Sequence, residues 1–151
     1  MKAHVVWSHP RSNSLTGHVV DSVIQQLSSV GFDVDVLDLQ RENFDPVLGS
    51  EDEPDWDNIN KKYSPEVHRL AERAQTSDVI IFVFPVWWYG LPAILKGYLD
   101  RVWNQGLLYN SSKSNSIKSV LWVALAGLPQ KSFEKRGYKD AIETILNDGV
   151  A

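Results

Sequence analysis

The sequence contains no cysteine, and this absence excludes disulfide bonds, a thiolate nucleophile and a metal site built on cysteine. It also lacks a long apolar run, since no stretch approaches the ~18 residues that a membrane-spanning helix needs. Neither the glycine-rich dinucleotide fingerprint nor a Walker phosphate loop is present. The formal net charge of -4 argues against a surface for nucleic acid or anionic membrane. The expected class is a cytoplasmic globular protein without nucleic-acid partners.

Short apolar runs alternate with segments of helical periodicity along the chain. The run over 79–83 is entirely apolar, as expected of a strand that is buried on both faces of a sheet. Helix signals include Gly31 after the first helix, and Ser64 and Pro65 at the start of the second. The pattern predicts strands over 4–8, 32–39, 78–84 and 119–126, and helices over 14–30, from 64 onward, over 92–106 and over 131–146. This alternation predicts an α/β fold, a doubly wound parallel sheet with helices on both faces.

Two parts of the chain depart from a regular doubly wound sheet. Residues 41–63 are polar and acidic and carry two prolines, which predicts a long excursion that is functional or contacts a partner. After the last predicted helix, the chain reaches Ala151 without the fifth strand and last helix of a flavodoxin-like order. We therefore expect a single domain over 1–151 that is incomplete at its C-terminal side. The fourth strand is then an exposed edge, or an edge that a partner covers.

The most informative segment is 84–103, directly after the third predicted strand. It places three adjacent aromatic residues, Trp87, Trp88 and Tyr89, in a turn, where a globular protein has little packing reason for them. Pro92 then suits the first position of a helix, because its missing N–H needs no partner there. A strand end followed by such a turn and a helix is where open α/β sheets bind planar cofactors. The alternatives are aromatic residues that only bridge strand and helix, or a protein interface.

A polar loop follows the first predicted strand. It reads Ser-His-Pro-Arg-Ser-Asn-Ser-Leu-Thr over 8–16 and leads into the first helix. Hydroxyl groups and backbone N–H donors at a helix N-terminus form an anion site, which the helix dipole strengthens. His9 can add a hydrogen bond to a phosphate. The alternative is that Ser12, Asn13 and Ser14 only cap the helix, but the aromatic turn at a neighbouring strand end favours phosphate binding.

These two segments resemble the flavodoxin-like NAD(P)H:quinone oxidoreductase family, which includes the modulator-of-drug-activity proteins and the ancillary oxidoreductases of potassium efflux. The resemblance spans essentially the whole chain, and the 84–103 block is its most specific part. It implies a bound flavin, FMN or FAD, and NAD(P)H as co-substrate. It places the flavin phosphate and ribityl chain beside His9, Ser14, Leu15 and Thr16. It places the isoalloxazine beside Pro85, Val86, Trp87, Trp88 and Tyr89.

The loop after the fourth predicted strand departs from the family pattern. The tripeptide Gly-Leu-Pro over 127–129 stands where the family has a glycine pair, and Phe133 stands at a position that is usually tyrosine. Lys139 occupies the position of a histidine in some members. The resemblance makes Gly127 a cofactor-binding residue and makes Tyr138 and Lys139 candidate catalytic residues, because a hydroxyl and a cation can stabilise a reduced flavin. Alternatively, both are solvated residues of the last helix.

The activity that the resemblance implies is two-electron reduction of a quinone-like acceptor by NAD(P)H, through hydride transfer to and from the bound flavin. The family also implies a homodimer. Two alternatives stay open: a regulatory subunit that docks on a membrane transporter, as the potassium-efflux ancillary proteins do, and an inactive truncated remnant. No metal is expected, since His4, His18 and His68 show no ligand spacing.

Overall fold

In the computed structural model, which describes residues 1–111 and 116–150, four parallel strands form one sheet in the order β2-β1-β3-β4. The strands are β1 (Lys2–Trp7), β2 (Asp33–Asp38), β3 (Val79–Pro85) and β4 (Ser119–Leu125). Trp7 at the end of β1 is in register with Asp38 of β2 and Val83 of β3, so the carboxyl ends of these strands meet at one edge of the sheet. The predicted doubly wound α/β fold is confirmed. Ala151, where the predicted single domain ends, lies outside the described residues.

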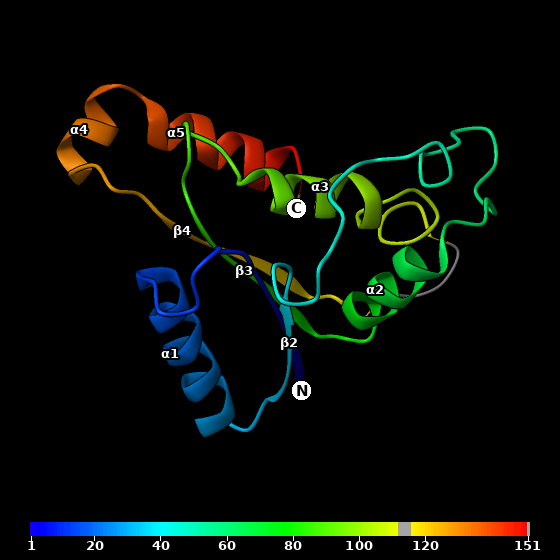
Figure 1. The fold of residues 1–151 in the computed structure, drawn as a ribbon, viewed down its shortest axis with the longest axis horizontal. Coiled ribbons are helices and arrows are strands. Elements are labelled where there is room, and N and C mark those ends of the chain that lie inside the picture. Colours follow the sequence, from blue (N-terminus) through cyan, green and yellow to red (C-terminus); the bar gives the residue numbers. More distant parts are fainter. Residues whose placement is uncertain (112–115, 151) are drawn as a thin grey trace.

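Helices cover both faces of the sheet (Figure 1). One face carries α1 (Leu15–Ser29), and the other carries α2 (Pro65–Gln75), α3 (Ala93–Val102) and α5 (Tyr138–Glu143). Successive side chains of a strand point to opposite faces, so Val5 and Trp7 pack with Val20 of α1, whereas Val6 joins the larger core under α2 and α3. Burial on both faces explains why the central strands are almost entirely apolar.

The strand β4 lies at the end of the sheet, and in the described part of the chain it pairs with β3 alone. Its side chains are less buried than those of β3, and Leu121 is 47% exposed. Val123 and Leu125 are half-buried on the face that α1 covers. Within the described residues, β4 is therefore an edge of the sheet.

Two predicted helices are shorter than their apolar periodicity indicated. The predicted helix over 131–146 is wrong as a single element, since it is divided into α4 (Gln130–Lys135), α5, and a π-helical segment η1 (Thr144–Asp148). Gly137 separates the first two, and its φ of 69° is a left-handed conformation that glycine adopts without a Cβ penalty. The helix α3 ends at Val102 rather than at 106, because the chain turns away at Trp103 with a ψ of 59°.

The predicted excursion over 41–63 is attached to α2 and α3 by a buried ion pair between Asp52 and Arg101. The Arg101 Nη2 lies 2.9 Å from Asp52 Oδ2, and Arg101 Nη1 lies 2.9 Å from a Glu66 carboxylate oxygen. Ser64, the N-cap of α2, donates both its backbone N–H and its hydroxyl to Asp52. Burial raises the pKa of Asp52, but the hydrogen bonds from Ser64 and Arg101 outweigh it and hold that pKa below its ordinary value. These contacts close the excursion onto the domain.

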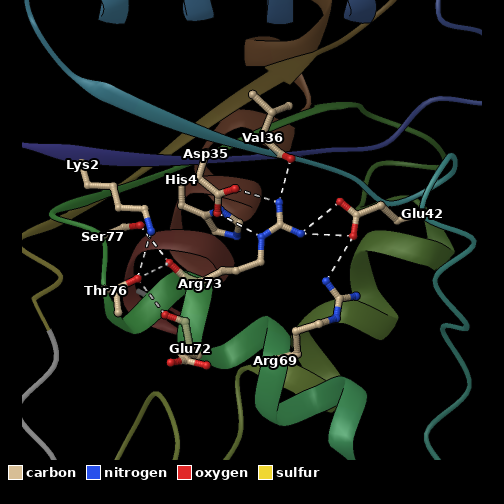
Figure 2. Close-up of polar contacts among 10 residues, drawn as sticks. All are labelled: Lys2, His4, Asp35, Val36, Glu42, Arg69, Glu72, Arg73, Thr76 and Ser77. Atoms are coloured by element: carbon tan, nitrogen blue, oxygen red, sulfur yellow. Dashed lines mark hydrogen bonds and ion pairs between the residues drawn. The ribbon is translucent and has the colours of Figure 1, made fainter.

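A second polar network joins the sheet to α2 (Figure 2). Asp35 of β2 accepts hydrogen bonds from Arg73 Nε and Nη2, both at 3.0 Å, and the fully buried His4 places Nδ1 at 2.9 Å from Asp35 Oδ2. Arg73 extends the network outward to Glu42, at 3.0 and 3.1 Å. His4, the largest cause, and Arg73 hold the pKa of Asp35 well below its ordinary value, although burial raises it.

This depressed pKa predicts a loss of stability in acid. A carboxylate whose pKa is lower in the folded state stabilises that state above its unfolded pKa of about 3.9, and the contribution is lost as the pH falls below that value. We expect the urea midpoint of the protein to fall between about pH 4 and pH 2. Asp35→Asn should be less stable at pH 7 and should decline less steeply with acid. A decline of Asp35→Asn as steep as that of the wild type would contradict this assignment.

Candidate functional site

Two loops meet at the carboxyl edge of the sheet. The polar loop over 8–14 follows β1, and the aromatic turn over 86–92 follows β3, which is the neighbouring strand. The rings of His9 and Trp87 approach to 5.9 Å between centroids, with their planes inclined by 58°. The two segments that sequence analysis assigned to one site thus lie beside each other, as expected of a topological switch point.

The polar loop packs closely against the first turn of α1 and caps this helix. Ser14 is the N-cap residue, and its Oγ accepts a hydrogen bond from the Gly17 N–H at 3.2 Å. Among the described residues, nothing accepts a hydrogen bond from the backbone N–H of Leu15 or Thr16. A Cβ added to Gly17 would lie 1.9 Å from the Ser12 carbonyl oxygen, so glycine lets the loop fold against the first turn. Ser14 thus caps the helix, while two donors stay available to an anion.

Polar groups at the start of this loop also point to a ligand. The Ser8 hydroxyl is buried, with the residue 1% exposed, and has no hydrogen-bond partner in the part of the chain that the structure describes. His9 Nδ1 lies 3.0 Å from the backbone nitrogen and 3.0 Å from the backbone oxygen of Arg11. The Arg11 contact thus engages one ring nitrogen and leaves Nε2 to the site. A buried polar atom without a partner is costly, so Ser8 favours a bound polar group.

The aromatic turn is strained. Trp87 N–H donates to the Gly90 carbonyl at 3.2 Å, and Gly90 N–H donates back to the Trp87 carbonyl at 3.1 Å. The two central residues, Trp88 and Tyr89, both have positive φ, at 50° and 61°. Such a turn normally takes Asn-Gly, because a side chain with a Cβ is disfavoured there. Trp88 is moreover 97% exposed, so no packing within the chain compensates for its conformation.

Replacing Trp88 by asparagine should therefore stabilise the fold. Asparagine tolerates positive φ better than tryptophan, and the buried contacts of the chain are unchanged. We expect the free energy of unfolding, measured with urea, to rise by about 1 kcal/mol. No gain, or a loss, would show that the exposed indole has a stabilising contact within the fold.

A shallow apolar groove of about 200 Å³ lies between the aromatic turn and the loop that follows β4. Its lining residues are Val86, Trp88, Tyr89, Ala126, Gly127, Leu128 and Phe133. Nothing lies within 4 Å of the point where a Cβ at Gly127 would stand. The Val86 N–H donates to the Leu125 carbonyl at 2.8 Å and fixes the two loops relative to each other. Pro85, the last residue of β3, is buried below the turn.

The two candidate catalytic residues of the last helix face different surroundings. The Tyr138 ring stacks against Tyr89, with 3.9 Å between centroids and 31° between planes. Lys139 lies 3.7 Å from Glu143, and both residues line a groove of about 440 Å³ beside β4. This groove adjoins the smaller one, since Val86 and Phe133 line both. The structure thus places the Tyr138 ring against the aromatic turn and places Lys139 on the adjoining groove.

Sequence reasoning did not single out Gly17 and Arg41, and it gave Ser8 no role beyond the start of the polar loop. The position of Gly17 three residues after Ser14 is a usable signal, since glycine in a first helical turn often marks a close backbone approach. Ser8 was read as part of the first strand, and nothing local indicates that its hydroxyl lacks a partner. Arg41 comes from the excursion and reaches the loop only through the tertiary fold.

Comparison with known proteins agrees with this geometry. A family described by its flavodoxin-like fold matches residues 1–150. The chain belongs to this family. An uncharacterised NAD(P)H oxidoreductase of Escherichia coli (strain K12), YcaK, is 46% identical over 147 residues, which cover 97% of this chain and 75% of that relative. An uncharacterised NAD(P)H oxidoreductase of Haemophilus influenzae is 36% identical over 115 residues, which cover 75% of this chain and 55% of its own length.

The fold also matches a family structure. The NAD(P)H:quinone oxidoreductase of Methanothermobacter marburgensis superposes with a TM-score of 0.89 over 99% of this chain and 76% of that protein, at 26% identity. The chain therefore spans between about half and three quarters of the lengths of these three proteins. The flavodoxin-like fold predicted from the sequence is confirmed.

No helix in residues 1–111 and 116–150 is long and apolar enough to cross a membrane. In the same residues, no cluster of three or more His, Cys, Asp or Glu side chains is arranged as metal ligands.

Proposed function

We propose that this chain binds a flavin at the carboxyl edge of its sheet and acts as an NAD(P)H oxidoreductase that reduces quinone-like acceptors by two electrons. The observation that carries the proposal is the meeting of the polar loop and the aromatic turn, with His9 and Trp87 at 5.9 Å. One loop offers groups for a phosphate and the other offers a wall for a planar ring. The names of the relatives, NAD(P)H oxidoreductase and NAD(P)H:quinone oxidoreductase, support the same reaction class.

The residues present fit a flavin. The available N–H groups of Leu15 and Thr16, the partnerless Ser8 hydroxyl and the α1 N-terminus provide donors for an anion. The exposed face of the aromatic turn and the open space at Gly127 suit a flat ring system. We assign the phosphate and ribityl chain to His9, Ser14, Leu15 and Thr16. We assign the isoalloxazine to Pro85, Val86, Trp87, Trp88, Tyr89 and Gly127.

A flavin bound at these residues would supply two-electron hydride chemistry between NAD(P)H and the acceptor. The chain's own groups would bind the flavin, orient its ring and exclude water from the covered face of the ring. The wall that includes Trp88 and Tyr89 would cover one face of the ring and leave the other face to the two substrates in turn, so ping-pong kinetics are expected. Tyr138, whose ring contacts Tyr89, is the candidate for a hydroxyl that acts on the ring, and Lys139, which lines the adjoining groove with Val86, is the candidate cation.

We further propose that the active form is a homodimer. The groove of about 200 Å³ is smaller than the ~300–1,000 Å³ of most ligand pockets and is open on one side. A second copy can supply the missing wall. The 41–63 excursion is the candidate contributor, since it exposes Val47 and Trp56 at 70% and 67%. The cytoplasmic location expected from the sequence stays a prediction.

The test is reconstitution of the purified protein with FMN and, separately, with FAD. We expect a flavin absorbance band after desalting, and flavin-dependent oxidation of NADH or NADPH when a benzoquinone is added. Initial rates should give parallel lines in double-reciprocal plots. A protein that retains neither flavin would overturn the proposal. Flavin binding with negligible turnover would favour a regulatory subunit that docks on a transporter, or an inactive remnant, in place of the enzyme.

A further inference from the structure

Arg41, the first residue of the excursion, binds the backbone of the polar loop through its guanidinium group. Its Nη1 donates to the His9 carbonyl at 2.8 Å, and its Nη2 donates to the Pro10 carbonyl at 2.9 Å. The guanidinium carbon also lies 5.3 Å from the centroid of the Trp7 ring, at the end of β1. One planar side chain thus bridges two successive backbone carbonyls that lie about thirty residues earlier in the sequence.

Arg41 is itself held by the turn that follows β2. Asp38 Oδ1 accepts hydrogen bonds from the backbone N–H groups of Gln40 and Arg41, both at 3.1 Å, and the Asp38 carboxylate lies 3.3 Å from Arg41 Nη1. The next residue, Glu42, binds Arg73 at 3.0 and 3.1 Å, and Arg73 in turn binds Asp35 in the sheet (Figure 2). The start of the excursion is therefore fixed on both sides of Arg41.

The chemistry of the contact requires arginine rather than any cation. A guanidinium presents donors in a rigid fork that can span two carbonyls, whereas a lysine ammonium is a single point on a flexible stem. The carbonyls of His9 and Pro10 and the carboxylate of Asp38 already occupy the Arg41 terminal nitrogens, and the nearby Asp38 charge offsets the guanidinium. The Arg41 guanidinium therefore binds the backbone of the loop and not a ligand.

We propose that Arg41 is a positioning residue: it sets the conformation of residues 9–13 so that the α1 N-terminus and His9 converge on the flavin phosphate. This inference rests on the proposed function, because it assigns the loop to a phosphate. It does not make Arg41 a ligand of the phosphate. Binding energy gained from the phosphate should thus depend on Arg41, while stacking of the ring should not.

The test compares FMN with riboflavin, which differ only by the phosphate. For Arg41→Gln we expect the FMN dissociation constant to rise about tenfold and that of riboflavin by less than about twofold. Arg41→Lys should behave like Arg41→Gln, because the fork is lost although the charge is kept. The matched control is Arg69→Gln, which removes an equal charge from the Glu42 network and has no contact with the loop. It should leave both constants unchanged.

A second measurement does not require flavin. Hydrogen exchange of the backbone amides over 8–14, in the protein without cofactor, should become about tenfold faster in Arg41→Gln and Arg41→Lys, and not in Arg69→Gln. The exposed position of Arg41, at 39% of its side-chain area, leaves the variants folded with little change in urea midpoint.

The outcomes separate the two proposals. Wild-type FMN affinity in Arg41→Lys would overturn the positioning role, because charge alone would then suffice. An equal loss of FMN and riboflavin affinity in Arg41→Gln would also overturn it, since the ring site would then be affected. If the wild type binds neither flavin, the proposed function fails. In that case unchanged hydrogen exchange over 8–14 in Arg41→Gln overturns the positioning role as well, and faster exchange supports its effect on the loop.

Discussion

Replacing Gly17 by alanine is expected to lower the affinity for FMN about a hundredfold. The added Cβ would stand 1.9 Å from the Ser12 carbonyl oxygen, and an ordinary contact begins near 3.4 Å. The loop must therefore retreat by more than 1 Å, and a displacement of that size commonly costs about a hundredfold at a preorganised site. The loss would appear as a shift in the flavin fluorescence titration. Because the same loop carries His9 and Ser14, it would affect the phosphate end of the site first.

The stability of Gly17→Ala supplies an internal check. In an unconstrained helix, alanine is more favourable than glycine by about 1 kcal/mol. Here we expect the urea midpoint to fall instead, because the backbone of Ser12 leaves no room for a methyl group. The matched control is Gly49→Ala in the excursion, where nothing lies within 4 Å of the added Cβ. If Gly17→Ala were more stable than the wild type and bound FMN normally, the tight loop and its role would both be wrong.

Asp52→Asn is expected to destabilise the fold by about 3 kcal/mol. Breaking a buried ion pair by neutralising one partner costs about 3–5 kcal/mol, since the other charge stays buried. The side chains of Asp52 and Arg101 are only 5% and 8% exposed. The expected loss lies at the lower end of that range because Glu66 still contacts Arg101, at 2.9 Å. Urea unfolding at pH 7 measures the change in the free energy of unfolding.

Asp100→Asn is the matched control for this prediction. It makes the same chemical change in the ion pair between Lys96 and Asp100 on α3, where the side chains are 58% and 40% exposed. Exposed pairs contribute roughly 0–1 kcal/mol, so a loss below about 1 kcal/mol is expected. Equal losses in the two variants would mean that the buried pair does not anchor the excursion.

Features that depend on nearby residues were predictable. Ser64 was predicted as a helix cap, and Ser14 as a cap in the alternative to phosphate binding; both accept hydrogen bonds from backbone N–H groups three residues later. The apolar run of β3 and the alternation of strands and helices predicted the parallel sheet. The aromatic turn and the polar loop were identified as one candidate site because parallel strands end at the same edge. Gly137 was a local signal that was overlooked, and it breaks the predicted last helix.

Other features depend on residues that are far apart in the chain. Arg41 and His9 are separated by 32 positions, and Asp52 and Arg101 by 49. The Tyr138 ring meets Tyr89 of the aromatic turn, and Lys139 lines a groove together with Val86. Hydrophobic periodicity says which face of a helix is buried, and it does not say where a long loop passes or which polar groups it meets.

The amino-acid sequence by itself determined the α/β class, the absence of thiol chemistry, and the two segments that line the candidate site. These follow from local rules of capping, periodicity and residue chemistry. Only the tertiary structure decided that Arg41 holds the polar loop, that Asp52 and Arg101 close the excursion, and that the Tyr138 ring packs against Tyr89. The reason is that such contacts form where the folded backbone brings distant polar groups together. Once these groups are buried away from water, they must form hydrogen bonds with one another.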